Sequence, residues 1–519
     1  MRKPWRSLCA DPEMKRKFAF ETAKSGWREP YAQGTILAVA AAVVVVWVLT
    51  KPIVFTQDTI TYINAARELR LGQSAGDIFS RLPAFPAVLA AFHITDLKHT
   101  VFWLIVFQAC LAVGSCWLFY LTARLLSPRV GAFVVSLIFI ASLLPFVQVK
   151  HIMTEQTFFF ETMLTAFGMV AYLLARTMRG AWFSLAVLGV GTTLMTLTRP
   201  QGAYVVPVVF GLVGVLAWRR AALAIVGAIM VLGAVWSIQI LDHRARSMSQ
   251  MSAGSLDSSH MTGKMFFFTF YLDGSSRANI RIAPENGPKT AELKALLLDE
   301  YAKPHTLARR KGNLVVPPQD VPAYVERMFS EPNSEFFDLL AFASLDDRLG
   351  PKEADRLLLQ VCLEAALAYP VPTARLFIEK GLEIYFNPWM LSVPSHPPFV
   401  PGYFQSALAD EVAAGGDYTT PTRADYAIDQ NIRWLMRIAV LVAVITLPFA
   451  LRYHTWRVTI ALLVFGLYLN VAVVVGNSPL FRYAIYAIPV NLLCGYAGAV
   501  AVFAALWKRY LKKSVAVNG

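Results

Sequence analysis

The sequence predicts an all-α polytopic membrane protein with about ten transmembrane helices. Of its 519 residues, 56% are hydrophobic and only 16% are charged, whereas soluble domains carry about 25% charged residues. Apolar runs recur along the chain, as at 35–50 and 458–476, and about 20 apolar residues cross a bilayer as a helix. These observations exclude an ordinary soluble enzyme, a disordered chain and a disulfide scaffold.

The apolar runs define ten candidate spans. They lie near residues 35–50, 101–121, 131–148, 157–175, 182–198, 203–217, 221–241, 435–451, 458–476 and 484–507. A further apolar run at 363–392 is interrupted by Pro370 and Pro372, so eleven or twelve spans remain an alternative.

The positive charge follows the membrane half of the chain. Residues 242–434 hold 24 acidic and 19 basic side chains, which leaves 10 acidic and 29 basic residues elsewhere. This distribution favours membrane lipids as partners and argues against nucleic acid. Basic residues gather in alternate connections, and such connections stay cytoplasmic. We therefore expect both termini in the cytoplasm, with the first apolar run as an uncleaved span.

The alternation also predicts the domain organisation. We expect cytoplasmic tails at 1–34 and 508–519. A transmembrane module at 35–241 would carry the catalytic residues and include a first external loop at 51–100. An external domain at 242–434 would lie between spans 7 and 8, followed by C-terminal transmembrane helices at 435–507. Helical patterns near 289–301, 321–330, 335–345 and 352–382 predict that the external domain is mostly helical.

The first external loop contains two amphipathic patterns. One begins at Asp58 and ends at Gly72, and the other follows Pro83 and places Phe85 and Leu89 on one face. We expect two short helices along the membrane surface.

Carboxylates are scarce outside the long segment. After Glu161, no acidic residue occurs in any predicted span or short connection. Secondary transporters commonly use intramembrane carboxylates for ion coupling, so this scarcity argues against that class.

The candidate catalytic residues are Asp58 and Glu155, because both are acids predicted at the external face. Basic and ring side chains at the same face suit a phosphate group. They are Tyr62, Arg81, Lys150, His151, Arg199, Arg482 and Tyr483.

Each candidate also has a purely structural interpretation. Asp58 could cap its helix, Glu155 could be a solvated turn residue, and His151 a surface histidine. Arg199 and Arg482 could extend from span ends to the interface. The histidines and cysteines show no ligand spacing, so no metal site is predicted.

The order of several short motifs resembles the GT-C superfamily of membrane glycosyltransferases, which includes bacterial relatives of protein mannosyltransferases and the aminoarabinose transferase. FTQDTITYINAARELRLGQ and FSRLPAFPAVLAAF resemble that family's first external loop, with Asp58, Arg81, Pro83 and Pro86 at its acidic and Arg-x-Pro-x-x-Pro positions. HIMTEQTFFFETM resembles its second external turn, and LTRPQGAYVVP its Arg-Pro-x-Gly element.

The resemblance implies sugar transfer from a polyprenyl-phosphate donor to a lipid, polysaccharide or protein acceptor, outside the inner membrane of a bacterium. Asp58 would be the base and Glu155 would orient the acceptor or a basic partner. Arg81, Lys150, Arg199 and Arg482 would be candidates to hold the phosphate. The loop lacks the paired acids of metal-dependent oligosaccharyl transferases, so no cofactor is expected and a divalent-metal requirement is doubtful.

Two other classes remain as alternatives. A flippase or transporter of a lipid-linked glycan would share the basic external cavity without covalent chemistry, and it would tolerate Asp58→Asn. A non-catalytic membrane assembly factor would depend more on the helical segment 352–382 than on Asp58.

Overall fold

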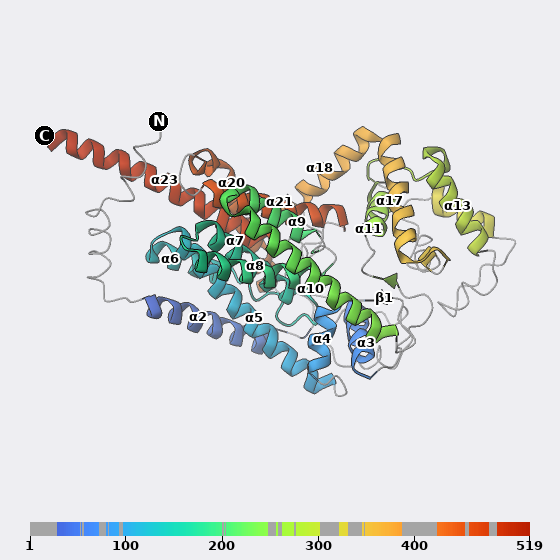
Figure 1. Cartoon of the computed structure of the whole chain (residues 1–519), viewed down its shortest axis with the longest axis horizontal. Helices are drawn as coiled ribbons and strands as arrows, with labels where there is room; N and C mark the ends of the chain where they lie inside the picture. Colours follow the sequence, from blue (N-terminus) through green and yellow to red (C-terminus); the bar gives the residue numbers. More distant parts are fainter. Residues whose placement is uncertain are drawn as a thin grey trace.

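The chain folds into a helical membrane bundle and a second, smaller helical unit (Figure 1). The computed structural model describes residues 29–51, 53, 57–71, 79–80, 82–92, 97–199, 202, 204–247, 256–257, 262–274, 277–301, 321–330, 345–346, 348–386, 423–451, 456–476 and 485–518. Within these ranges the only sheet is a two-residue parallel pairing of β1 (Phe79–Ser80) with β2 (Leu256–Asp257). The predicted all-α class is confirmed.

Seven described helices contain a stretch long and apolar enough to cross a membrane. They are α2 (Glu29–Thr50), α5 (Leu97–Leu126), α7 (Glu155–Leu174), α8 (Met178–Thr198), α10 (Ala221–Ser247), α20 (Arg423–Ala450) and α23 (Ala487–Asn518). The other three predicted spans coincide with α6 (Arg129–Ala141), α9 (Val205–Leu216) and α21 (Trp456–Gly476). The protein is therefore a multi-pass membrane protein. Two of these helices are short, since α6 has 13 residues and α9 has 12.

The third predicted span, 131–148, is too long at its C-terminal end. Helix α6 ends at Ala141, and Leu143 then adopts a positive φ of 62°. Successive turns follow, in which the Phe146 N–H bonds to Leu143 O and the Val149 N–H bonds to Phe146 O. Phe146 and Val149 are fully buried. The run is apolar because these turns lie inside the bundle. Hydropathy alone does not distinguish buried turns of this kind from a membrane-spanning helix.

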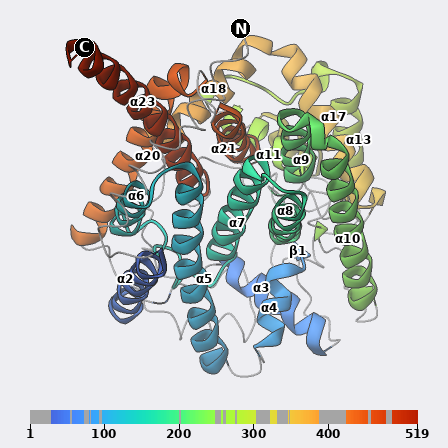
Figure 2. The same cartoon turned by 60° about the vertical axis from the view of Figure 1, so that its left-hand side comes forward.

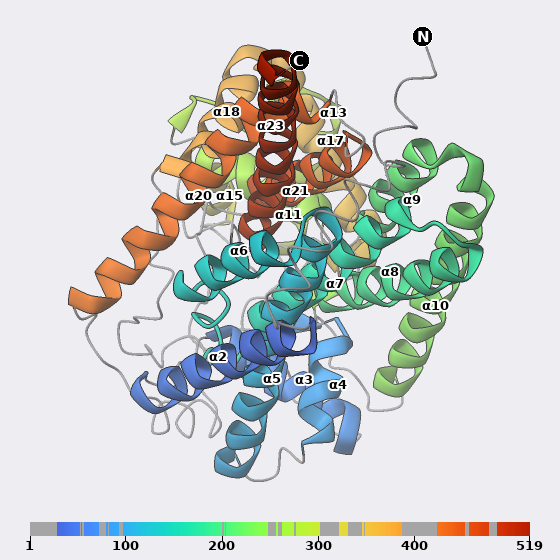
Figure 3. The same ribbon diagram turned by 90° about the vertical axis from the view of Figure 1, so that its left-hand side faces the viewer.

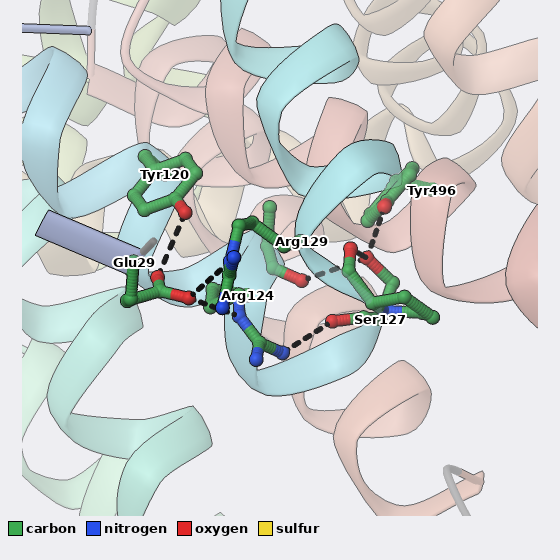
Figure 4. A network of polar contacts seen from close by, with 8 residues as sticks. Glu29, Tyr120, Arg124, Ser127, Arg129 and Tyr496 are labelled. Carbon is green, nitrogen blue, oxygen red and sulfur yellow. Dashed lines mark hydrogen bonds and ion pairs between the residues drawn. The ribbon is translucent and has the colours of Figure 1, made fainter. Parts of the chain in front are cut away.

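Contacts at both ends of the bundle join helix ends that the charge pattern assigns to the same side. At one end, the Glu29 carboxylate accepts hydrogen bonds from Tyr120 (2.8 Å), Arg124 (3.1 Å) and Arg129 (3.0 Å) (Figure 4). At the other end, Lys51 after α2 pairs with Asp425 at the start of α20. The two ends of α2 therefore lie at opposite ends of the bundle.

Helices α7 and α8 run side by side in the bundle (Figure 2). Their connection is short, since α7 ends at Leu174 and α8 begins at Met178. Glycines allow the two backbones to approach closely. A Cβ added at Gly168 would lie 2.7 Å from the Leu188 nitrogen, and one at Gly191 would lie 2.9 Å from the Thr165 nitrogen. Small residues at helix interfaces permit such packing in membranes.

The first loop forms the two predicted helices. They are α3 (Gln57–Leu71), followed directly by Gly72, and α4 (Ala84–Ala91). The two helices pack together, with the rings of Tyr62 and Phe85 edge to face at 5.2 Å. The β1–β2 pairing joins this loop to the segment after α10.

The second unit has its own hydrophobic core. Its elements are α11 (Thr262–Phe268), a π-helical turn η3 (Thr269–Gly274), a 3₁₀ turn η4 (Pro284–Asn286), α13 (Pro288–Tyr301), α15 (Val321–Ser330), α17 (Pro351–Ala368) and α18 (Pro370–Phe386). It also contains a buried ion pair between Lys264 and Asp346 (2.7 Å). The mostly helical character is as predicted, while most of the pattern at 335–345 lies outside the described residues. Both flanking helices extend into 242–434, because α10 ends at Ser247 and α20 begins at Arg423.

The close packing of α7 on α8 predicts that Gly168→Ala lowers the free energy of unfolding by about 1–3 kcal/mol, since a backbone must shift to admit the methyl group. Gly233→Ala in α10 is the matched control, because a Cβ there meets no described atom within 4 Å. Thermal unfolding in detergent measures both. Equal melting temperatures for the two variants would contradict the packing described here.

Candidate functional site

The centre of the candidate site is a buried ion pair between Glu155, the first residue of α7, and Arg199, which directly follows α8. Arg199 donates from Nη2 to Glu155 Oε1 at 2.5 Å and from Nε to Thr154 Oγ1 at 2.6 Å. Glu155 is fully buried and Arg199 is 4% exposed. The interpretations of Glu155 as a solvated turn residue and of Arg199 as an interfacial side chain are therefore wrong.

The local fold explains why these two residues meet. Because α7 and α8 are consecutive antiparallel helices, the start of α7 lies beside the end of α8. A carboxylate in the first turn of a helix also interacts favourably with the helix dipole.

A second buried carboxylate lies in the same region. Glu161, about 1.7 turns further along α7 at about 3.6 residues per turn, accepts a hydrogen bond from Thr198 Oγ1 at 2.6 Å. Thr198 immediately precedes Arg199. Among the described residues, neither Glu155 Oε2 nor Glu161 Oε2 has a hydrogen-bond partner. Each carboxylate therefore keeps an oxygen that can accept a bond from a ligand.

Aromatic rings enclose the Arg199 guanidinium. Its central carbon lies 5.9 Å from the ring centroid of Phe158 and 5.4 Å from that of Tyr486. The two rings contact each other edge to face at 4.7 Å. Such cation–π contacts strengthen when the cation is removed from water. Arg199 is thus a cation fixed from several directions.

The turn before α7 is held from two sides. Gln108 on α5 donates to His151 O (2.9 Å) and Met153 O (3.2 Å). Thr59 on α3 donates to Ile152 O at 3.0 Å. This contact places the backbone of Asp58 close to the turn that leads into Glu155. Asp58 lies in the first turn of α3, which begins at Gln57, and its side chain lies outside the described part of the structure.

Three other predicted residues are buried near this turn. Lys150 donates to Val48 O (3.0 Å) and to Lys51 O, so its ammonium group reaches the C-terminal end of α2. His151 is 5% exposed and contacts Gln148, which makes the surface interpretation of His151 wrong. Tyr62 packs on Phe85 in the interface between α3 and α4.

Arg81, Arg482 and Tyr483 lie outside the described residues. The sequence pattern does not distinguish Thr154, Thr198, Phe158 or Tyr486 as site residues. The last of these belongs to FRYAIYAIP, the segment that supplied Arg482 and Tyr483. Nothing in its sequence context distinguishes Tyr486 from Tyr483, because only the packing of α23 against α7 brings its ring to Arg199.

No group of three or more His, Cys, Asp or Glu side chains is arranged to hold a metal ion within the described ranges.

The fold and site define a multi-pass helical membrane protein with a buried, charged and aromatic site at one end of the bundle. No protein-family model and no curated protein sequence matches the chain. The solved structures to which the chain shows some similarity include the two that follow.

The first is the archaeal oligosaccharyltransferase AglB from Archaeoglobus fulgidus, in complex with an inhibitory peptide and a dolichol-phosphate. It is 14% identical with a TM-score of 0.42, over 94% of this chain and 52% of that chain. The present chain thus spans about half its length. The second is ArnT from Cupriavidus metallidurans bound to undecaprenyl phosphate, 12% identical with a TM-score of 0.32, over 90% of this chain and 78% of that chain. At these TM-scores neither structure assigns the site or the activity.

The buried ion pair predicts that Arg199→Gln lowers the free energy of unfolding by about 3 kcal/mol, because Glu155 is left as an unpaired buried charge. The double variant Glu155→Gln/Arg199→Gln should recover part of this loss. Denaturant unfolding in detergent measures the coupling.

The control is Arg375→Gln, because the ion pair of Arg375 with Glu379 is exposed, at 72% and 43%, and such pairs contribute little. If the effects of Glu155→Gln and Arg199→Gln on the free energy of unfolding were additive, the two side chains would not stabilise each other, and the ion pair described here would be contradicted.

Proposed function

We propose that the chain is a membrane glycosyltransferase that transfers a sugar from a polyprenyl-phosphate donor to an acceptor at the external membrane face, with inversion at the anomeric carbon. The observation that supports this most directly is the buried Glu155–Arg199 pair beside the start of α3. It supplies a fixed cation, and carboxylate oxygens without a partner among the described residues, beside the helix that carries Asp58.

The role of Arg199 follows from the charge that develops during transfer. As the bond between the anomeric carbon and the phosphate oxygen breaks, negative charge accumulates on the departing polyprenyl phosphate. A guanidinium already fixed in a site that excludes water stabilises that charge without reorganising. Arg199 meets this requirement, since it is buried and held by Glu155 and Thr154. Arg81, Lys150 and Arg482 remain further candidates to hold the phosphate.

Asp58 is proposed as the general base. It would take the proton of the acceptor hydroxyl or amine as the acceptor atom bonds to the anomeric carbon from the side opposite the phosphate. Glu155 would act through Arg199 by fixing its orientation. Its free oxygen, Oε2, could also accept a hydrogen bond from the acceptor. The side chains around the bound phosphate would be those of Tyr62, His151 and Tyr483.

The acceptor is proposed to be a lipid, a polysaccharide or a protein. The membrane is proposed to be the cytoplasmic membrane of a bacterium, with both termini in the cytoplasm and Asp58 on the far side. This orientation follows from the basic connections.

The proposed base predicts that Asp58→Asn lowers sugar transfer by about 100-fold or more, as general bases contribute 10²–10⁴ in rate. The assay uses a panel of radiolabelled polyprenyl-phosphate sugars and membranes with equal amounts of each variant. Asp299→Asn is the control, because this aspartate is 59% exposed in its ion pair with Arg348. Equal transfer by wild type and Asp58→Asn would remove Asp58 from the chemistry and direct attention to Glu155.

The same assay tests metal dependence. Because arginine and lysine side chains are proposed to balance the phosphate charge, transfer should continue in excess EDTA and should not rise on addition of Mn²⁺ or Mg²⁺. Complete loss in EDTA, with recovery on adding a divalent cation, would contradict the metal-independent mechanism.

A further inference from the structure

The corner between α17 and α18 presents an apolar surface that the proposed chemistry does not use. The two helices meet at Tyr369 with a bend of 109°, inside a pair that together is apolar enough for a membrane span. The bend excludes one straight span. One face of α17 packs in the core of the second unit, through Leu358, Val361 and Ala365.

The residues on the outer side of the corner are large and apolar. Leu363, Leu367 and Val371 are 55%, 81% and 76% exposed. No charged residue occurs from 365 to 374. The opposite end of α17 is polar, with Glu353 and Arg356 side chains 56% and 67% exposed. The helix therefore changes from a polar end to an apolar corner, and contiguous exposed apolar surface marks an interaction site.

The backbone of the corner suits an apolar surrounding. The Tyr369 N–H bonds to Ala365 O and the Thr373 N–H bonds to Tyr369 O, both at 2.9 Å. Pro370 and Pro372 have no N–H. The first turn of a helix normally presents unpaired N–H groups, and each would be costly in hydrocarbon. Two prolines here reduce that cost.

The exposed ion pair of Arg375 with Glu379 follows the corner on α18, and beyond Arg375 exposed apolar side chains continue towards the bundle. Helix α18 packs against α20 and α21, and Figures 1 and 3 show it extending from the corner towards them. On α18, Ile378 and Leu382 are 62% and 53% exposed. On α20, Trp434 and Leu441 are 56% and 58% exposed, as expected for residues that face lipid.

We propose that the α17–α18 corner inserts into the bilayer leaflet on the side of the second unit, with Leu367 and Val371 among the lipid chains. The occupant of this surface is the bilayer itself, because α18 packs against α20, a helix long and apolar enough to cross a membrane. The insertion fixes the second unit against the membrane, and it does not depend on the proposed sugar transfer.

Site-specific fluorescence quenching tests the insertion in the full-length protein. The background carries Cys9→Ser and Cys110→Ala, since Cys116, Cys362 and Cys494 are buried. Single cysteines at Leu367→Cys and Ile378→Cys are labelled with an environment-sensitive fluorophore in phosphatidylcholine nanodiscs. Arg356→Cys, at the polar end of α17, is the matched control. Each sample is quenched with nitroxide-labelled lipid and, separately, with aqueous iodide.

We expect the Leu367 and Ile378 labels to be quenched about threefold more by the nitroxide lipid than the Arg356 label, and less by iodide, as for groups below the headgroups. Iodide quenching of the Leu367 label as strong as that of the Arg356 label would place the corner in water. Protection of the Leu367 label from both quenchers would place it against protein. Either result overturns the proposal.

Discussion

The arrangement of the bundle depends on the need to pair two charges out of water. Removing a carboxylate and a guanidinium from water costs several kcal/mol per ion, and only close pairing with further hydrogen bonds offsets that cost. Glu155 and Arg199 satisfy this at one end of α7 and α8, with Thr154 as an additional acceptor. A slip of one helical turn between α7 and α8 would leave both charges unpaired, so the pair fixes their register.

The pairing of Glu155 with Arg199 also depends on contacts made by the surrounding helices. Close approach at Gly168 and Gly191 is what allows the two helix ends to meet. Gln108 and Thr59 then bind the carbonyl groups of the turn before α7, which ties α5 and the loop helix α3 to the site. The glycines fix the separation of the helices, the ion pair fixes their register, and the backbone contacts bring the first turn of α3 to the same place.

Much of the fold could be predicted from sequence. An apolar run long enough to cross a bilayer, and a Gly or Pro at a helix boundary, can each be recognised within a short stretch of sequence. The loop helices α3 and α4 and the helices α13 and α15 occur where the patterns predicted them. Local signals failed at residues 142–149, where buried turns are as apolar as a span. Residue type and sidedness identified Glu155 and Arg199 as candidates, but not their pairing. Thr198 and Tyr486 could not be found, because their contacts with Glu161 and Arg199 join segments far apart in the chain.

We propose that the Glu155–Arg199 end of the bundle receives the phosphate of a lipid-linked substrate. Cryo-electron microscopy of the full-length protein in nanodiscs with undecaprenyl phosphate tests it most directly. We expect phosphate density within hydrogen-bonding distance of the Arg199 guanidinium. Phosphate density at the opposite end of the bundle, beside Arg124 and Arg129, with no density near Arg199, would contradict it.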